Sequence, residues 1–162
     1  MIFVTVGTHP SPIDRLFRHL DEIAPFLNEK IIAQTGRTFF KPKNFETFSF
    51  TPNLQPYFKQ ARLVISHAAT SILEFSLNHK KPLIVFPRQK KFGEHINDHQ
   101  VEFANYFAKK ASVDAVLDVK MITPEFLRKY NRIPQDDIYG LVKLQSYFKC
   151  LFLNINNSLN GH

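Results

Sequence analysis

The sequence predicts one α/β domain built on a Rossmann-like parallel sheet with flanking helices. Short apolar, β-rich runs alternate along the chain with segments whose apolar residues recur at helical spacing. The clearest example is residues 63–87, in which an apolar run, a polar turn, an apolar-periodic segment and a second apolar run follow one another. That order is the strand–helix–strand unit of parallel sheets, whose crossovers are right-handed.

Length and composition fit one globular domain. The chain has 162 residues, of which 44% are hydrophobic and 22% are charged. Its single cysteine excludes an intrachain disulfide and is typical of a reducing compartment. Because the sequence shows neither a signal peptide nor an apolar run long enough to span a bilayer, we expect a cytoplasmic protein. The net charge of +7 indicates an anionic partner, which charge alone leaves open among nucleotide, nucleic acid and membrane surface.

The first part of the chain predicts three strands and two helices. Ser11 is a suitable N-cap with Pro12 at the first helical position, and apolar residues then recur at helical spacing. Weak alternation in the third strand indicates an edge strand. In order, the expected elements are a strand at 2–6, a helix at 11–24, strands at 29–34 and 45–50, and a short helix at 53–58.

After the unit at residues 63–87, the sequence predicts a polar loop and then more helices with one strand between them. In order, these are a loop at 88–94, a helix from 97 or 98 to 107, a strand at 113–119, a helix that starts at 123–125 and breaks at Pro134, and a final helix at 136–153. The apolar face of the final helix is wide enough either to contact a partner or to pack on its own sheet. We expect residues 1–153 to form the domain and 154–162 a polar tail.

The candidate site lies at the carboxyl edge of the sheet, where open α/β sheets bind ligands. The turn after the first strand, Gly7-Thr8-His9, lacks the full GxGxxG fingerprint, so a dinucleotide site is not predicted. Its glycine permits close approach of backbone amides to a phosphate or to a polar substrate edge. The alternative is an ordinary tight turn.

A second turn, residues 68–71, leads into a helix after Ser66-His67. Free amides and the positive end of the helix dipole favour a diphosphate there, and the hydroxyls of Thr70 and Ser71 can add donors. The alternative is plain N-capping. Glu74 lies one turn into the helix, where a carboxylate can accept hydrogen bonds from both ribose hydroxyls or offset the helix dipole.

His95 and His99 are four residues apart, a spacing that can hold a metal on a helix, but the sequence offers no third ligand and no DxD motif. We therefore expect no metal site, and we expect polar groups at this helix start to hydrogen-bond at the same edge. The densest basic patch is Arg88 with Lys90 and Lys91. It fits a diphosphate site, a solvated surface or a nucleic-acid contact.

Taken together, these motifs resemble the C-terminal, nucleotide-sugar-binding half of family 28 glycosyltransferases. The resemblance runs in order through VTVGTH at 4–9, QTG at 34–36, ISHA and SILE between 65 and 74, KPLIVFPR at 81–88, and KKFGEHINDHQ at 90–100, of which the last is the most specific. Within this family the chain is similar to small subunits of bacterial exopolysaccharide and capsule glycosyltransferases. It is also similar to the catalytic subunit of the two-part eukaryotic enzyme that adds N-acetylglucosamine to a dolichol-linked sugar.

The resemblance implies one half of a GT-B enzyme divided between two chains. This chain would bind a UDP-sugar as substrate, with no cofactor and no nucleic acid. A membrane-anchored partner would hold the lipid-linked sugar acceptor and keep the chain at the inner face of the cell membrane. Glu74 would hold the ribose, the turn at 69–72 would face the diphosphate, and His99 and Gln100 would contact the sugar or phosphate. The expected donor contacts are Gly7, Thr8, His67, Ala69, Thr70, Ser71, Glu74, Arg88, His99 and Gln100.

One departure from the family pattern bears on function. The family has a glycine-rich turn of the form SHAGxGSILE, whereas this chain has the shorter SHAATSILE. Inverting, metal-independent transfer also needs a base, for which His9 is the candidate because its loop faces the cleft; the alternatives are a histidine that only orients the loop and a base on the partner. Because of the altered turn, a non-catalytic accessory subunit is an alternative function. Because of the positive charge, an RNA-binding domain is another alternative.

Overall fold

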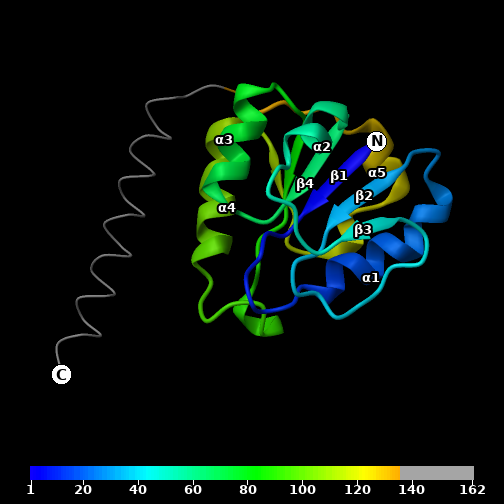
Figure 1. Ribbon diagram of the computed structural model, residues 1–162. Coiled ribbons are helices and arrows are strands. Elements are labelled where there is room, and N and C mark those ends of the chain that lie inside the picture. Colours follow the sequence, from blue (N-terminus) through cyan, green and yellow to red (C-terminus); the bar gives the residue numbers. More distant parts are fainter. Residues whose placement is uncertain (136–162) are drawn as a thin grey trace.

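A computed structural model describes residues 1–135 of the chain, and a parallel sheet forms its centre (Figure 1). In this part of the chain six strands are hydrogen-bonded in the order β3-β2-β1-β4-β5-β6, and each neighbouring pair is parallel. This is the strand order of the Rossmann fold, with its switch point between β1 and β4, so the predicted fold is confirmed. The strands are β1 (Ile2–Thr5), β2 (Ile31–Gln34), β3 (Glu46–Phe48), β4 (Leu63–Ser66), β5 (Leu83–Val85) and β6 (Asp114–Ala115).

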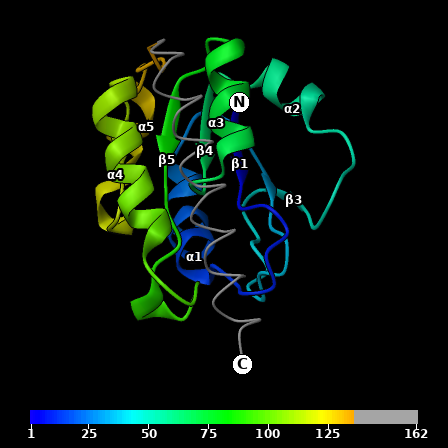
Figure 2. The same ribbon diagram turned by 90° about the vertical axis from the view of Figure 1, so that its left-hand side faces the viewer.

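Helices cover both faces of the sheet (Figure 1, Figure 2). Side chains of α1 and α5 pack in one apolar cluster, and side chains of α2, α3 and α4 pack in a second cluster on the other face. The helices are α1 (Asp14–Ile23), α2 (Gln55–Gln60), α3 (Thr70–Asn78), α4 (His99–Ala111) and α5 (Pro124–Lys129), with 3₁₀ turns η1 (Ala24–Phe26), η2 (Lys90–Phe92) and η3 (Val119–Met121).

The central strand β1 shows how an uninterrupted apolar run serves both faces. Ile2 and Val4 join the cluster under α1, and Phe3 joins the cluster under α3 and α4. Strands buried on both faces are typical of parallel sheets. By contrast, Glu46 and Thr47 of β3 are exposed, and β3 is the edge strand that its weak alternation predicted.

The predicted start of α1 is wrong by two residues, because Pro12 is expected at the first helical position. The helix begins at Asp14, and its N-cap residue Ile13 makes no side-chain capping bond. Ser11 is not the cap because its backbone is used elsewhere: its N–H donates to Nδ1 of His9 (3.2 Å), and its carbonyl accepts from Arg88 (2.6 Å). The prediction for α5 is confirmed at its start, where the Thr123 hydroxyl accepts from the N–H of Phe126.

The expected polar loop at 88–94 is only partly a surface loop. Arg88, Gln89 and Glu94 are buried, while the 3₁₀ turn between them is exposed. The sheet strand expected at 113–119 is two residues long, with one further backbone bond from Val116 to Val85. The predicted final helix at 136–153 and the polar tail lie outside the described residues. Within residues 1–135, no helix is both long and apolar enough to cross a bilayer.

Candidate functional site

Three loops meet at the carboxyl end of the sheet, beside the switch point between β1 and β4. Gly7 follows β1 with φ +67°, and a Cβ there would lie 2.8 Å from Cε1 of His67, which follows β4. Gly36 follows β2 with φ +56°, and its Cβ would lie 2.3 Å from the carbonyl oxygen of Gly7. Only glycine fits these two positions without displacement, because the conformation is left-handed and the neighbouring atoms fill the space of a side chain.

Arg88 follows β5, the strand next to β4, and its side chain binds the loop after β1. Its Nη2 donates to the carbonyl of Val6 (2.9 Å) and its Nη1 to the carbonyl of Ser11 (2.6 Å), while its own N–H donates to Oε1 of Gln100 (3.1 Å). The side chain is 1% exposed, and Nε is buried without a hydrogen-bond partner. Arg88 therefore lies beneath the loop rather than in the exposed basic patch with Lys90 and Lys91. Its role as a donor contact stays a prediction.

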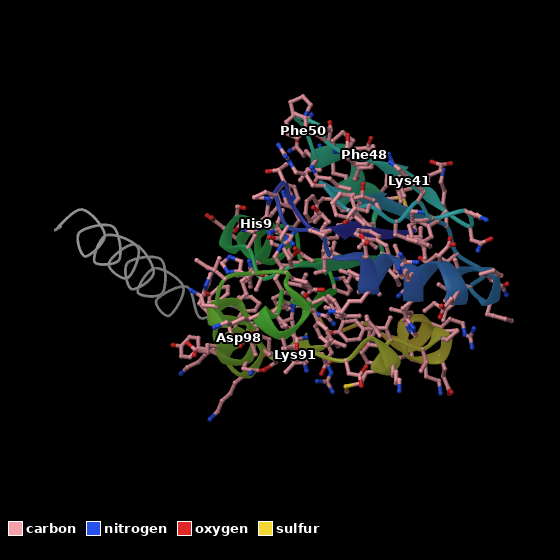
Figure 3. All side chains as sticks on the ribbon, turned by 90° about the horizontal axis from the view of Figure 1, so that it is seen from below. His9, Lys41, Phe48, Phe50, Lys91 and Asp98 are labelled. Atoms are coloured by element: carbon pink, nitrogen blue, oxygen red, sulfur yellow. The ribbon has the colours of Figure 1, made fainter. Side chains whose placement is uncertain are left out.

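Three imidazoles gather above Arg88, and we call His9, His95 and His99 the histidine cluster. The rings of His9 and His95 stack with centroids 4.9 Å apart, and the ring of His99 meets that of His95 edge-on at 4.4 Å. Nδ1 of His9 accepts from the N–H of Ser11, and Nδ1 of His99 makes a short contact with Oδ1 of Asn97. Nδ1 of His95 is buried without a hydrogen-bond partner. Figure 3 views this end of the molecule, with His9 and Asp98 labelled.

The histidines at this edge are neutral at pH 7, because burial lowers the pKa of each one. Burial lowers the pKa of His67 to about 4, and the charge of Arg88 adds to that shift. Burial and then Arg88 also lower the pKa of His9 and of His95, while the Asn97 side chain opposes the shift of His95. For His99, burial and then His95 lower the pKa. A group of neutral imidazoles around one guanidinium favours an anion.

Arg15 of α1 fixes the loop that carries His95. Its Nε and Nη2 donate to the two carboxylate oxygens of Glu94 (2.8 and 3.1 Å), and its terminal nitrogens also donate to the carbonyls of Pro87 and Leu117. Glu94 is 3% exposed and also accepts from the N–H of Gln89. Because a bidentate pair of this kind sets both distance and orientation, the loop has one position relative to α1.

Helix α3 begins after an extended residue and needs no glycine. Its N-cap, Ala69, has φ −96° and ψ +125°, and no side-chain hydrogen bond caps the helix. Neither Ala68 nor Ala69 is among the described residues with positive φ, so the loss of the family's glycines causes no backbone strain here. Ser71 and Glu74 are exposed on this helix. Because Ala69 is the N-cap, Ser71 lies inside the helix and does not cap it.

The structure brings several of the predicted residues together and leaves others apart. Contacts join Gly7 to His67, Arg88 to Gln100, and His9 to His99 through His95. Thr8, Ser71 and Glu74 are exposed. Among the described residues, no group of three or more His, Cys, Asp or Glu side chains has the arrangement of a metal site.

The sequence interpretation missed Arg15 and Glu94, and it gave His95 no role of its own. A lone arginine on a helix and a glutamate in a KKFGEH run look like surface residues, and no local signal marks either as buried. His95 has one local signal, its spacing of four from His99, but that spacing by itself indicates only a metal motif.

Comparisons with known proteins agree with the fold. Residues 1–132 match the glycosyltransferase family 28 C-terminal domain. The chain is 33% identical over 122 residues to the human (Homo sapiens) protein named UDP-N-acetylglucosamine transferase subunit ALG13, a match that covers 67% of this chain and 10% of the human one. It is similar in structure to the glycotransferase of kitacinnamycin (TM-score 0.58, 19% identity, 80% of this chain and 33% of that one). It is also similar to MurG of Acinetobacter baumannii (TM-score 0.52, 16% identity, 78% of this chain and 39% of that one). The chain thus spans a small part of its human relative and less than half of each solved structure.

Proposed function

Because the chain belongs to glycosyltransferase family 28, through the C-terminal domain of that family, we propose that it is the donor-binding, catalytic subunit of a two-chain GT-B glycosyltransferase. The donor is a UDP-sugar carrying a hexose or N-acetylhexosamine. The acceptor is a sugar linked to a polyprenyl diphosphate in exopolysaccharide or capsule synthesis. A membrane-anchored partner supplies the acceptor half and holds this chain at the inner face of the cell membrane. The name of the human relative, a subunit of a UDP-N-acetylglucosamine transferase, supports the donor and the partner.

One observation carries this proposal: the loops after β1 and β4 converge at the switch point around a buried cation. Gly7 lies against His67, and Arg88 bonds to Val6 and Ser11 of the β1 loop. Ligands of doubly wound sheets bind at this place. Glycosyl transfer releases a nucleoside diphosphate, and groups that stabilise its negative charge lower the barrier without a metal.

His9 is our candidate for the base that takes the acceptor proton. Burial and Arg88 lower its pKa, so the ring is neutral at pH 7, as a base must be. Its Nδ1 accepts from the N–H of Ser11, which places the hydrogen of the neutral ring on Nε2. Proton transfer to His9 therefore requires the bond to Ser11 to open when the acceptor arrives. The alternative is that the base lies on the partner.

Substitution of Glu74 tests the donor assignment. We expect Glu74→Ala to abolish UDP-sugar binding and to leave the fold intact, because the exposed carboxylate would accept two ribose hydroxyls and its side chain is outside both cores. Isothermal titration calorimetry with UDP and a UDP-sugar measures the affinity, and circular dichroism checks the fold. Glu22→Ala removes an equally exposed helical glutamate from α1 and serves as the control. Donor affinity equal to that of the unmodified chain would remove Glu74 from the ribose site.

Substitution of His9 tests the base. For His9→Ala assayed with its partner, we expect kcat to fall by about 100-fold or more, the usual size of general-base catalysis, while donor affinity changes little. His79→Ala, at the exposed C-terminal end of α3, is the control. A fall in donor affinity with unchanged kcat would instead give His9 a binding role and move the base to the partner.

The altered SHAATSILE turn favours a second candidate, an accessory subunit that has the fold but no donor chemistry. Ala69 and Thr70 occupy the turn in which the family pattern has glycines, although the backbone of this turn is unstrained. Calorimetric titration of the purified chain and of the co-purified pair with UDP separates the two candidates. Binding supports the catalytic subunit, whereas its absence in both samples supports the accessory subunit. Binding of RNA that is insensitive to UDP and falls steeply with salt would overturn both.

A further inference from the structure

The histidine cluster contains hydrogen-bonding capacity that the protein itself leaves unused. Nδ1 of His95 and Nε of Arg88 are both buried and have no hydrogen-bond partner. A buried polar atom without a partner destabilises the folded protein, so such atoms are rare and each one needs an explanation. In His9 and His99, by contrast, Nδ1 already has a contact, with Ser11 and Asn97 respectively. His95 is therefore the ring of the three whose Nδ1 has no partner.

The charges around His95 leave a cation, Arg88, that is only partly compensated. Arg88 acts on His9, His67 and His95 alike, lowering the pKa of each. The buried carboxylate of Glu94 acts on Arg88, but its two oxygens accept hydrogen bonds from Nε and Nη2 of Arg15.

The remaining charged groups face the site from α4 and the turn before it. Glu102 acts on His99 and raises its pKa, against the larger effects of burial and His95. The carboxylate of Asp98 accepts from the N–H of Lys90, and the side chains of Lys90 and Lys91 are exposed. The balance at His95 is therefore positive, with one unused nitrogen on the imidazole and one on the guanidinium.

We propose that the histidine cluster and Arg88 form an anion site for a diphosphate group, and that His95 takes up one proton from solvent as the site fills. The identity of this diphosphate rests on the proposed function. Under that function it is the diphosphate of the sugar nucleotide, and the lipid-linked acceptor is a second ligand that carries the same group. The proton goes to a ring nitrogen of His95, and the imidazolium then donates to a phosphate oxygen.

Electrostatics explains why the proton arrives with the ligand. In the unliganded chain, burial and Arg88 keep His95 neutral, and a diphosphate replaces that repulsion with attraction. A protonated His95 in turn lowers the pKa of the stacked His9. One proton therefore enters the cluster rather than two, and His9 stays neutral beside the bound diphosphate.

Calorimetry in two buffers of different ionisation enthalpy tests this inference, because the difference in observed heat gives the number of protons taken up. The full chain is titrated with UDP-N-acetylglucosamine, geranyl diphosphate and uridine between pH 6 and 8. We expect the sugar nucleotide to take up close to one proton at pH 7.5, and its affinity to fall by up to about tenfold for each pH unit of increase. Uridine, which has no phosphate, should bind without proton uptake and with little dependence on pH.

Two variants assign the proton. His95→Gln should abolish the proton uptake, and its affinity for the sugar nucleotide at pH 6 should be about the same as at pH 8. Subtracting the proton uptake of the variant from that of the unmodified chain cancels the ionisation of the ligand itself. His79→Gln, which changes an exposed histidine at the end of α3, should retain both the uptake and the pH dependence.

The possible outcomes distinguish this inference from the proposed function. Binding of the sugar nucleotide with no proton uptake, or with uptake that survives in His95→Gln, overturns this inference and leaves the proposed function standing. Proton-linked binding of geranyl diphosphate without binding of the sugar nucleotide supports the anion site but assigns it to the acceptor and contradicts the donor role. No binding of any diphosphate ligand to the chain overturns this inference, and no binding to the co-purified pair either overturns the proposed function as well.

Discussion

A Gly36→Ala variant is expected to lose about 3 kcal/mol of folding stability, from a left-handed backbone cost and from steric overlap. Gly36 has φ +56°, and an added Cβ would lie 2.3 Å from the carbonyl oxygen of Gly7, well inside van der Waals contact. That oxygen belongs to a backbone, so it cannot move as the end of a side chain would. The loop after β1 has to shift, and with it the contact between Gly7 and His67.

Gly93→Ala is a matched control for this substitution. Gly93 also has a left-handed backbone, with φ +69°, but nothing lies within 4 Å of the position of its Cβ. It should lose only the backbone term, about 1 kcal/mol. Chemical denaturation gives both free energies of unfolding, and titration with UDP reports whether the displaced loop has weakened the site. Equal losses in the two variants would mean that the β1 and β2 loops do not pack as tightly as described.

Acidification from pH 7 to pH 4 is expected to remove about 3 kcal/mol of stability through His67 alone, since each unit of pKa shift is worth about 1.4 kcal/mol. In the folded chain burial lowers the pKa of this imidazole to about 4, whereas an unfolded histidine has an ordinary pKa of about 6.5. Between these values the unfolded state binds more protons than the folded state, so stability falls as the pH falls. The contribution is complete above pH 6.5 and is lost progressively toward pH 4.

The measurement is the free energy of unfolding of the unmodified chain and of His67→Gln at pH 7 and pH 5. Over this interval the unmodified chain should lose about 2 kcal/mol more than the variant, whatever the variant costs at pH 7 through packing. Lowered pKa values of His9, His95 and His99 act in the same direction and are common to both chains. His79→Gln should behave like the unmodified chain. A His67→Gln variant with the same pH dependence would show that the folded state does not lower the pKa of His67.

Much of the fold could be predicted because it depends on local sequence patterns. Apolar runs such as that of β1 are buried on both faces and alternate with helical periodicity, and Thr123 with Pro124 marks the start of α5. The position of the site follows from the same pattern, because the turns after parallel strands share one edge. The failed cap at Ser11 has the opposite cause: a residue far along the chain uses its carbonyl.

The buried charges of the site could not be predicted from local pattern. Arg88 is buried because the carbonyls of Val6 and Ser11, 82 and 77 positions away, accept its guanidinium hydrogens. The same holds for Arg15 and Glu94, which are 79 positions apart. Each of these residues is of a charged type that is usually exposed to solvent, and only the tertiary fold supplies the hydrogen-bond partners that offset the cost of its burial.

The cross-links made by Arg15 and Arg88 have a thermodynamic consequence for recognition. They join α1, the loop after β1, and the segment between β5 and α4 into one preorganised wall, so the conformational entropy of these loops is lost during folding rather than on association. In the proposed two-chain enzyme, association should then protect few new backbone amides in these segments from hydrogen exchange, and closure around a substrate should occur by rigid-body rotation of this domain against the proposed partner.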